Sequence, residues 1–194
     1  MPLRPLSDHR AVLALGSNLG ESESTIERAV VDLREVGMRI LRVSPLYRTA
    51  PVGGPAGQPD YVNAVIEVST SLRPYELLKL CNAVEAAHHR ERQVRWGPRT
   101  LDIDVIDYEG VVSDDPVLTL PHPRAHERSF VLTPWARMDP EAHLLVARSD
   151  ESSGAVNYVP VSVAELSRDL NLTHEDAGED AIRYMREMNL PGAL

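Results

Sequence analysis

The chain has 194 residues, of which 43% are apolar and 25% are charged, a composition typical of one well-packed globular domain. Its formal net charge of -9 argues against a general nucleic-acid-binding surface. No apolar run reaches membrane-spanning length, the first residues lack a signal-peptide core, and Cys81 is the single cysteine, so we expect a cytoplasmic protein without an internal disulfide.

The first part of the chain alternates between strand and helix patterns. A short apolar run at 11–18 ends in a Gly-Ser-Asn turn and predicts a buried strand. Residues 21–37 carry apolar side chains at helical spacing and end at Gly37, a residue type that favours a helix end. Residues 38–49 predict a second strand that is interrupted near Pro45. We therefore expect a strand, a helix and a broken strand in this order.

The next segments extend this pattern. Three prolines and three glycines in 51–59 predict a loop. Residues 60–71 alternate between two faces and predict a strand. Residues 73–92 have a proline near their start and apolar residues at helical spacing, which predicts a helix. Charged and apolar residues then alternate in 101–108, which predicts a further strand.

The order of these elements indicates the fold class. Residues 117–138 add a short strand, a proline-rich turn and a helix that begins at about Ser129. The resulting order, β-α-β-β-α-β, predicts an α+β protein: a ferredoxin-like βαββαβ sandwich with an antiparallel sheet and helices packed on it.

The C-terminal part of the chain has weaker patterns. We expect one domain over residues 1–165 and an appendage of unknown role over 166–194. Residues 148–160 predict a polar loop, 161–170 a short helix and 175–188 an acidic amphipathic helix.

Asp102 and Asp104 are separated by one residue within a predicted strand, so their carboxylates project from the same face. Ile103 and Val105 then point into the core. Two like charges on one face repel unless a cation or arginines lie between them, and carboxylates alone suit a hard ion such as Mg²⁺. The alternative is a solvent-exposed edge strand with two ordinary acids. Asp107 has the opposite parity and is expected to be a strand-end acid only.

A cluster of arginines precedes this strand, and its members are Arg90, Arg92, Arg95 and Arg99. One guanidinium group can donate two hydrogen bonds to a phosphate at once, and it remains charged when buried. Arginines beside a carboxylate pair therefore favour Mg²⁺-nucleotide chemistry. The glycine-rich "GSNLGES" is not followed by the Gly-Lys-Ser/Thr of a Walker A loop, and the spacing of Cys81 from His88, His89 and His122 does not match a zinc site.

Four segments together resemble a known family of enzymes. They are "ALGSNLG", "YRTAPVGGPAGQPDYVNAV", "RWGPRTLDIDVI" and "LTLPHPRAHERSFVL", in this order over about residues 11–140. The chain resembles the 6-hydroxymethyl-7,8-dihydropterin pyrophosphokinases of folate biosynthesis. The resemblance implies that ATP donates its β,γ-pyrophosphate to the hydroxymethyl group of the dihydropterin and that AMP is released.

The resemblance also implies roles for individual residues. Two Mg²⁺ ions would be held by Asp102 and Asp104, with ATP as co-substrate. The catalytic residues would be Arg90, Arg99, Asp102 and Asp104. The ATP-binding residues would be Glu85, Arg92, Trp96, Arg99, Val105 through its backbone, Thr119, His122 and Arg128. The pterin-binding residues would be Thr49, Val52, Tyr61, Asn63, Asp102 and Phe130. The nucleophile would be the hydroxyl of the substrate, and we expect no protein general base.

The chain departs from the family pattern at a few positions, namely Ala50, the pair His88 and His89, Val117 and Pro123.

A second hypothesis is a non-catalytic module that holds a nucleotide or an RNA end through the arginines. The net acidity argues against RNA. We expect small-molecule substrates, no nucleic-acid or membrane partner, and a monomer, with self-association through the C-terminal tail as an alternative.

Overall fold

A computed structural model describes residues 8–51, 57–88, 100–150, 154–173 and 182–191 of the chain. Within these ranges, the N-terminal elements are β1 (His9–Ser17), α1 (Ser22–Glu35), β2 (Arg39–Val43), β3 (Leu46–Thr49), β4 (Tyr61–Thr70), α2 (Pro74–Ala87) and β5 (Asp102–Tyr108). Each element predicted for this part of the chain is present, and the strand predicted to break near Pro45 is divided into β2 and β3.

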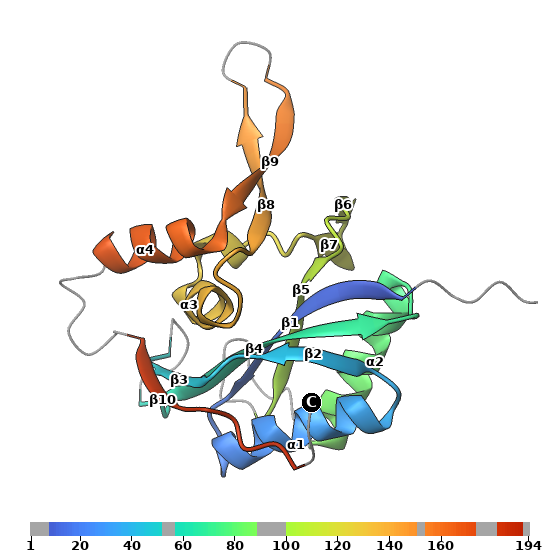
Figure 1. Cartoon of the computed structure of the whole chain (residues 1–194), viewed down its shortest axis with the longest axis vertical. Coiled ribbons are helices and arrows are strands. Elements are labelled where there is room, and N and C mark those ends of the chain that lie inside the picture. Colours follow the sequence, from blue (N-terminus) through green and yellow to red (C-terminus); the bar gives the residue numbers. More distant parts are fainter. Residues whose placement is uncertain (1–7, 52–56, 89–99, 151–153, 174–181, 192–194) are drawn as a thin grey trace, which may run out of the picture.

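The main sheet has the order β10-β3-β4-β1-β5, and β2 pairs with β4 outside this path. All of these pairings are antiparallel. Helices α1 and α2 lie on one face of the sheet and α3 lies over the other (Figure 1). This arrangement confirms the predicted ferredoxin-like α+β class.

The C-terminal elements are β6 (Ser113–Asp115), β7 (Leu118–Leu120), the 3₁₀ turn η1 (Ala125–Glu127), α3 (Ser129–Met138), β8 (His143–Ser149), β9 (Val156–Ser162), α4 (Val163–Thr173) and β10 (Arg183–Arg186). The predicted short strand, turn and helix at 117–138 are confirmed as β7, η1 and α3. The short helix predicted at 161–170 is confirmed as α4. None of the helices in the described ranges is long and apolar enough to cross a membrane.

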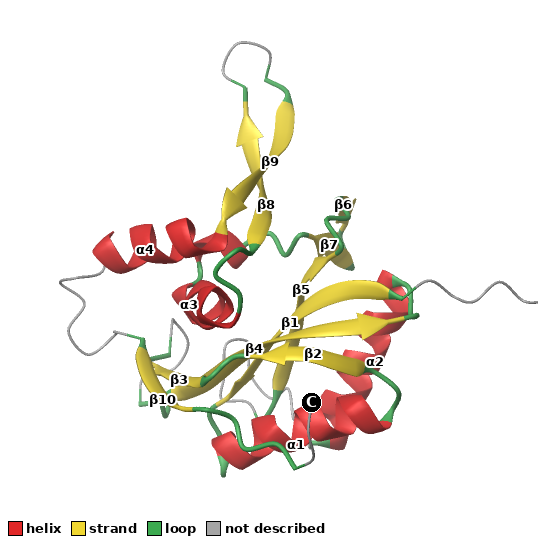
Figure 2. Ribbon diagram, in the orientation of Figure 1, coloured by secondary structure: helices red, strands yellow, loops and turns green. Residues whose placement is uncertain are grey.

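Two predictions for the C-terminal part were wrong. The polar loop predicted at 148–160 contains the end of β8 and most of β9, which form a projecting hairpin (Figure 2). Residues 156–160 are all exposed, so burial imposed no clear alternation on their sequence. The helix predicted at 175–188 is replaced in its described part by the strand β10, which pairs with the edge of β3. The boundary between 1–165 and 166–194 stays a prediction.

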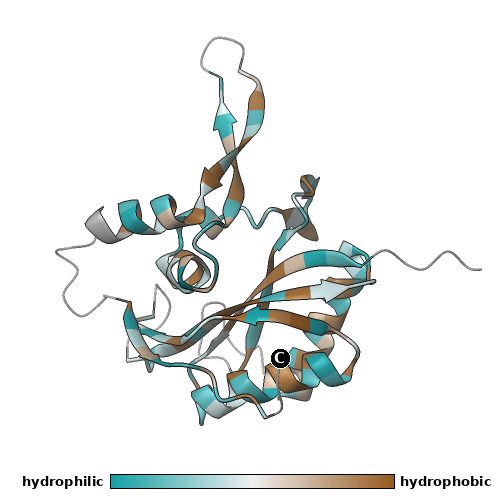
Figure 3. Ribbon diagram, in the orientation of Figure 1, coloured by the Kyte–Doolittle hydropathy of each residue, from teal (hydrophilic) through white to brown (hydrophobic). Residues whose placement is uncertain are grey.

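The sheet separates two apolar cores. The first lies against α1 and α2 and includes Leu13, Ile66 and Cys81, and the second lies against α3 and includes Val65 and Trp135. Apolar residues (brown) run along the central strands in Figure 3. Burial raises the pKa of the Cys81 thiol to about 12, which disfavours a reactive thiolate at this position in α2.

Ser44 lies at the break between β2 and β3. Its backbone N–H donates to the Val65 carbonyl at 2.9 Å, and its Oγ accepts the Val65 N–H at 2.9 Å. The side chain thus replaces a backbone acceptor where Pro45 interrupts the strand. Both β2 and β3 can therefore pair with the single long strand β4.

We expect Ser44→Ala to lower the free energy of unfolding by about 1–3 kcal/mol, because the buried Val65 N–H would lose its acceptor. Urea denaturation measures this change. The exposed Ser24 on α1 provides a control, since Ser24→Ala should stay within about 0.5 kcal/mol of the parent chain. Equal effects of the two substitutions would contradict the role given to Ser44.

Candidate active site

The register of three strands places polar residues on the α3 face of the sheet. Gly16 of β1 pairs with Asn63 of β4 and with Asp102 of β5. The next residue of β1 on this face, Ala14, pairs with Asp104. Ala14 belongs to the second core, and directly paired residues project from the same face of a sheet. The predicted shared face of Asp102 and Asp104 is therefore confirmed.

The parity predicted for Asp107 was wrong. The pairing of β1 with β5 shifts between Val12 and Leu13, so that Val12 pairs with Asp107 while Leu13 pairs with Val105. This β-bulge adds one residue and returns Asp107 to the face of Val12. Burial, with a smaller contribution from Glu109, raises the pKa of Asp107, and its carboxylate accepts the Gly110 N–H at 3.3 Å. Asp107 thus serves the turn at the far end of β5.

Gly16 is a site residue that sequence reasoning missed. A Cβ at this position would lie 3.3 Å from Asn63 Oδ1 and 3.8 Å from Tyr61 Cδ1. A side chain at this position would therefore crowd the Asn63 amide between β4 and β5, where Asn63 and Asp102 lie about 10 Å apart by strand spacing. A glycine inside an apolar strand was the available signal, because it often marks a close approach of a ligand or another group.

Three of the residues predicted to bind the pterin lie together on β3 and β4. Asn63 Nδ2 donates to Thr49 Oγ1 at 2.8 Å, and both residues are buried. Tyr61 pairs with Thr49 across the two strands and is partly exposed. The hydrogen bond to Thr49 orients the amide of Asn63, so that its Oδ1 lies toward Gly16.

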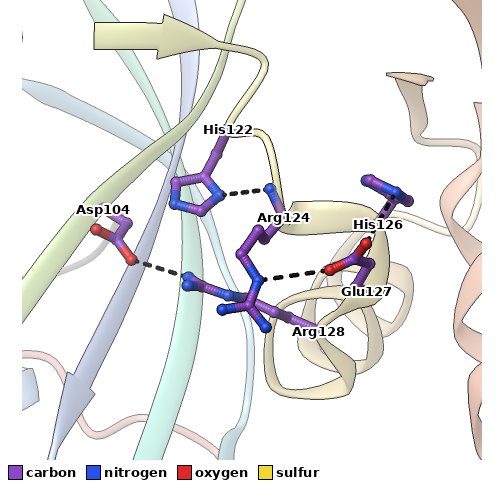
Figure 4. A network of polar contacts seen from close by, with 6 residues as sticks. All are labelled: Asp104, His122, Arg124, His126, Glu127 and Arg128. Atoms are coloured by element: carbon purple, nitrogen blue, oxygen red, sulfur yellow. Dashed lines mark hydrogen bonds and ion pairs between the residues drawn. The ribbon is translucent and has the colours of Figure 1, made fainter. Parts of the chain in front are cut away.

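Arg128 lies opposite the carboxylate pair. Its Nη1 donates to Asp104 Oδ2 at 3.3 Å (Figure 4). Its guanidinium lies 5.4 Å from the centre of the Phe130 ring. The Arg128 carbonyl accepts the N–H groups of Val131 and Leu132, so the residue is fixed at the start of α3. Arg128 thus supplies a positive charge at the edge of the site.

His122 is held between β5 and the turn before α3. Its backbone N–H donates to the Ile106 carbonyl at 2.8 Å, and its Nδ1 accepts the Arg124 N–H at 3.2 Å. Burial lowers the pKa of His122 to about 4, with further contributions from the charges of Arg128 and Arg124. The ring is therefore neutral near pH 7, and because Nδ1 accepts a hydrogen bond its proton lies on Nε2.

Glu85 connects α2 to the strand that carries the aspartates. The side chain is only 2% exposed, and its Oε1 accepts the Ile103 N–H at 2.7 Å. Thr119 of β7 is partly exposed and donates its hydroxyl to the Asp115 carbonyl at 3.0 Å. The side chain of Val105 packs in the first core, so only its backbone is available to a ligand.

The remaining predicted site residues lie outside the described ranges; they are Val52, Arg90, Arg92, Trp96 and Arg99. The arginine cluster follows His88, at the end of α2. His88 Nε2 bonds to Asp32 Oδ2 of α1 at 2.6 Å, which fixes the last described residue before the cluster.

The donor set fits Mg²⁺. Asp102 and Asp104 offer hard carboxylate oxygens from one face, and both are partly exposed. Within the described residues, no group of three or more His, Cys, Asp and Glu side chains gathers around a common point. Mg²⁺ is commonly bound by one or two carboxylates together with water and substrate phosphates. Asp102 and Asp104 could therefore hold it in the presence of a nucleotide.

The fold is a ferredoxin-like α+β sandwich, and a carboxylate pair beside Arg128 has the chemistry of a site for a divalent cation and a phosphate donor. The family model for 7,8-dihydro-6-hydroxymethylpterin-pyrophosphokinase matches residues 12–140, and the chain belongs to this family. The resemblance inferred from the four sequence segments is thereby confirmed.

Comparison with individual proteins agrees with this family. The 2-amino-4-hydroxy-6-hydroxymethyldihydropteridine pyrophosphokinase of Methylorubrum extorquens is 44% identical over 133 residues, which cover 68% of this chain and 84% of the relative. The enzyme of the same name from Mycobacterium bovis is 38% identical over 187 residues, covering 91% of this chain and 90% of the relative. This second match extends over the C-terminal part.

A solved structure of similar fold is wild-type HPPK-DHPS from Plasmodium falciparum with pterin and p-hydroxybenzoate. Its TM-score is 0.64 at 14% sequence identity, with 94% of this chain covered. The chain spans about half the length of that protein, namely 49%. At this identity the likeness concerns the fold.

The low pKa of His122 predicts a loss of stability in acid. The unfolded chain takes up a proton at this ring near pH 6.5, whereas the folded chain does so near pH 4. The contribution is therefore complete above about pH 6.5 and is lost as the pH falls through about 4. NMR titration of the ring should give this low midpoint, and His122→Gln should reduce the difference in unfolding free energy between pH 7 and pH 4.5. A midpoint near 6.5 would refute the burial of this ring.

Proposed function

We propose that the α3 face of the sheet binds ATP beside 6-hydroxymethyl-7,8-dihydropterin. As a member of its family, the chain transfers the pyrophosphoryl group of ATP to the hydroxymethyl oxygen of the dihydropterin in folate biosynthesis, and AMP is the second product. The observation that carries the proposed location is the pairing of Gly16 with both Asn63 and Asp102, which brings the two predicted halves of the site to one surface.

Asp102 and Asp104 are the proposed ligands of two Mg²⁺ ions. These two carboxylates would hold the metal, which would supply positive charge to offset the negative charge that develops on the ATP phosphates during transfer. The two carboxylates repel each other on their shared face, so they favour a cation between them. Arg128 already offsets part of this charge through Asp104, and in the proposed complex its guanidinium also faces the phosphates.

The ATP side of the proposed site combines residues that the structure describes with residues that lie outside the described ranges. His122 is neutral near pH 7 and can donate from Nε2 without adding positive charge. Glu85 holds the start of β5, and Thr119 and the Val105 backbone lie nearby on β7 and β5. We assign Arg90, Arg92, Trp96 and Arg99 to the phosphates and the nucleotide on the family pattern alone, with Arg90 and Arg99 in the catalytic step.

The pterin side requires recognition of a flat ring with an amide-like edge. Asn63 offers a donor and an acceptor in one group, and Thr49 fixes its orientation. Tyr61 and Phe130 are the proposed aromatic partners of the ring, with Val52 completing the slot. Gly16 forms the floor between Asn63 and Asp102, where a ring can approach the backbone closely.

The proposed mechanism uses positioning and charge rather than a protein base. The hydroxyl of the substrate attacks the β-phosphorus of ATP and loses its proton to water, while the bond from that phosphorus to the α,β-bridging oxygen breaks and AMP leaves. Binding both substrates on one surface makes the reaction between the pterin hydroxyl and the phosphates effectively unimolecular. The alternative is a module that binds the nucleotide without AMP release.

We propose a monomer, because the tail strand β10 is already paired with β3 of the same chain.

The direct test measures AMP release from Mg-ATP with and without hydroxymethyl-dihydropterin. We expect Asp102→Asn and Asp104→Asn each to reduce pterin-dependent turnover on the order of 100-fold or more, because the cation would lose a ligand. The exposed Asp114 on β6 provides the control, and Asp114→Asn should retain full turnover. Near-native turnover in either site variant would reject the metal assignment, and ATP binding without AMP release from the parent chain would favour the binding module.

Gly16→Ala tests whether Gly16 acts on the pterin through the Asn63 amide. The added Cβ would lie 3.3 Å from Asn63 Oδ1, so we expect the KM for the pterin to rise about tenfold while the KM for ATP changes little. A double-mutant cycle with Asn63→Ala gives the control. Once the Asn63 amide is absent, Gly16→Ala should have almost no further effect on pterin KM. Additive effects would mean that the added methyl acts by another route.

A further inference from the structure

The C-terminal strand β10 extends the main sheet beside β3. Arg183 pairs with Arg48, Tyr184 with Tyr47 and Arg186 with Leu46. Without β10, the short strand β3 would be an edge strand, paired with β4 through three residues only. β3 ends at Thr49, the residue that orients the Asn63 amide. The tail is thus in direct contact with the strand that shapes the proposed pterin side of the site (Figure 1).

Arg186 anchors β10 to α1 through two carboxylates. Its Nε lies 2.8 Å from Glu23 Oε2, and its Nη1 lies 2.7 Å from Glu27 Oε1. The Asn189 N–H also donates to Glu27 Oε1, at 2.6 Å. Burial opposes ionisation of Glu27, but the hydrogen bonds from Arg186 and Asn189 lower its pKa overall.

Further contacts hold the segment after β10 in place. Met185, Met188 and Leu190 pack against the first core. The Pro191 carbonyl accepts a hydrogen bond from Arg34 Nη2 at 2.9 Å. These contacts run along α1. The tail therefore connects α1 to β3 of the main sheet.

A row of paired residues runs from the tail to the proposed site. Tyr184 contacts Tyr47 edge to face, with ring centres 6.0 Å apart and planes at 83°. Tyr47 pairs with Asn63, Asn63 with Gly16, and Gly16 with Asp102. Tyr47 is only 6% exposed, whereas Tyr184 is 56% exposed and forms the outer end of the row. A movement of β3 would therefore act on Asn63 through both Tyr47 and Thr49.

We propose that β10, anchored by Arg186, is a positioning element for the pterin side of the site. By holding β3 against β4, it keeps Thr49 at hydrogen-bonding distance from Asn63. This inference rests on the proposed function and extends it to a segment that lies outside the matched range 12–140 of the family model. The tail contacts described above lie on β3, on α1 and on the first core, so we expect its effect to be confined to the pterin.

The test compares two arginines that each bridge two carboxylates. Arg186→Gln removes the anchor of β10. Arg42→Gln is the matched control, because Arg42 is similarly exposed (44% against 40%) and contacts Glu67 and Asp139 away from β3. We expect Arg186→Gln to raise the KM for the pterin about fivefold or more, with little change in the KM for ATP or in kcat. Arg186→Lys should restore part of the pterin affinity.

Stability is measured in the same variants by thermal unfolding. If Arg186→Gln lowers the unfolding temperature as Arg42→Gln does but leaves the pterin KM unchanged, the tail only stabilises the fold and the inference is wrong. If the Arg186 variant does not fold, Tyr184→Thr gives the same test with the ion pairs intact. In a Thr49→Ala background, Arg186→Gln should add little to the pterin KM; an undiminished effect would overturn the route through Thr49. An inactive parent chain would instead reject the proposed function.

Discussion

The candidate site depends on one constraint, the register that pairs Gly16 with Asn63 on one side and Asp102 on the other. Because paired residues project from the same face, this register places an amide and a carboxylate on one surface with no side chain between them. Asp104 then lies one step further along the same face. A register shift of one residue would turn both carboxylates toward the first core, where no cation could reach them.

Backbone hydrogen bonds hold the polar side chains of the site before any ligand arrives. The Glu85 carboxylate accepts the backbone N–H of the residue after Asp102. The backbone N–H of His122 donates to a β5 carbonyl two residues beyond Asp104. Asn63 is fixed by a side chain of β3 instead. Groups held in this way need little reorganisation when charge develops during a reaction, which is how a protein without a general base can accelerate transfer.

Charge is arranged unevenly in this acidic chain. Its net charge is -9, yet the α3 face places the cation Arg128 beside Asp104 and near His122. Burial lowers the pKa of the neighbouring His122 ring, and the same guanidinium that offsets a carboxylate adds to this effect. In the proposed site, an anionic substrate would therefore meet a fixed positive charge and a neutral donor, and the two aspartates would hold a divalent cation.

Short-range patterns in the sequence determined the order of elements through α3 except for the short strand β6, the shared face of Asp102 and Asp104, and the family. Periodicity and contiguous motifs carry this information. Only the tertiary structure decided the rest. The strand β10 depends on an open edge of β3 and on two α1 carboxylates that receive Arg186. A bulge against β1 moved Asp107 to the other face. The position of Gly16 between Asn63 and Asp102 followed only from the register of three strands, since pairing between distant segments leaves no local periodic signal.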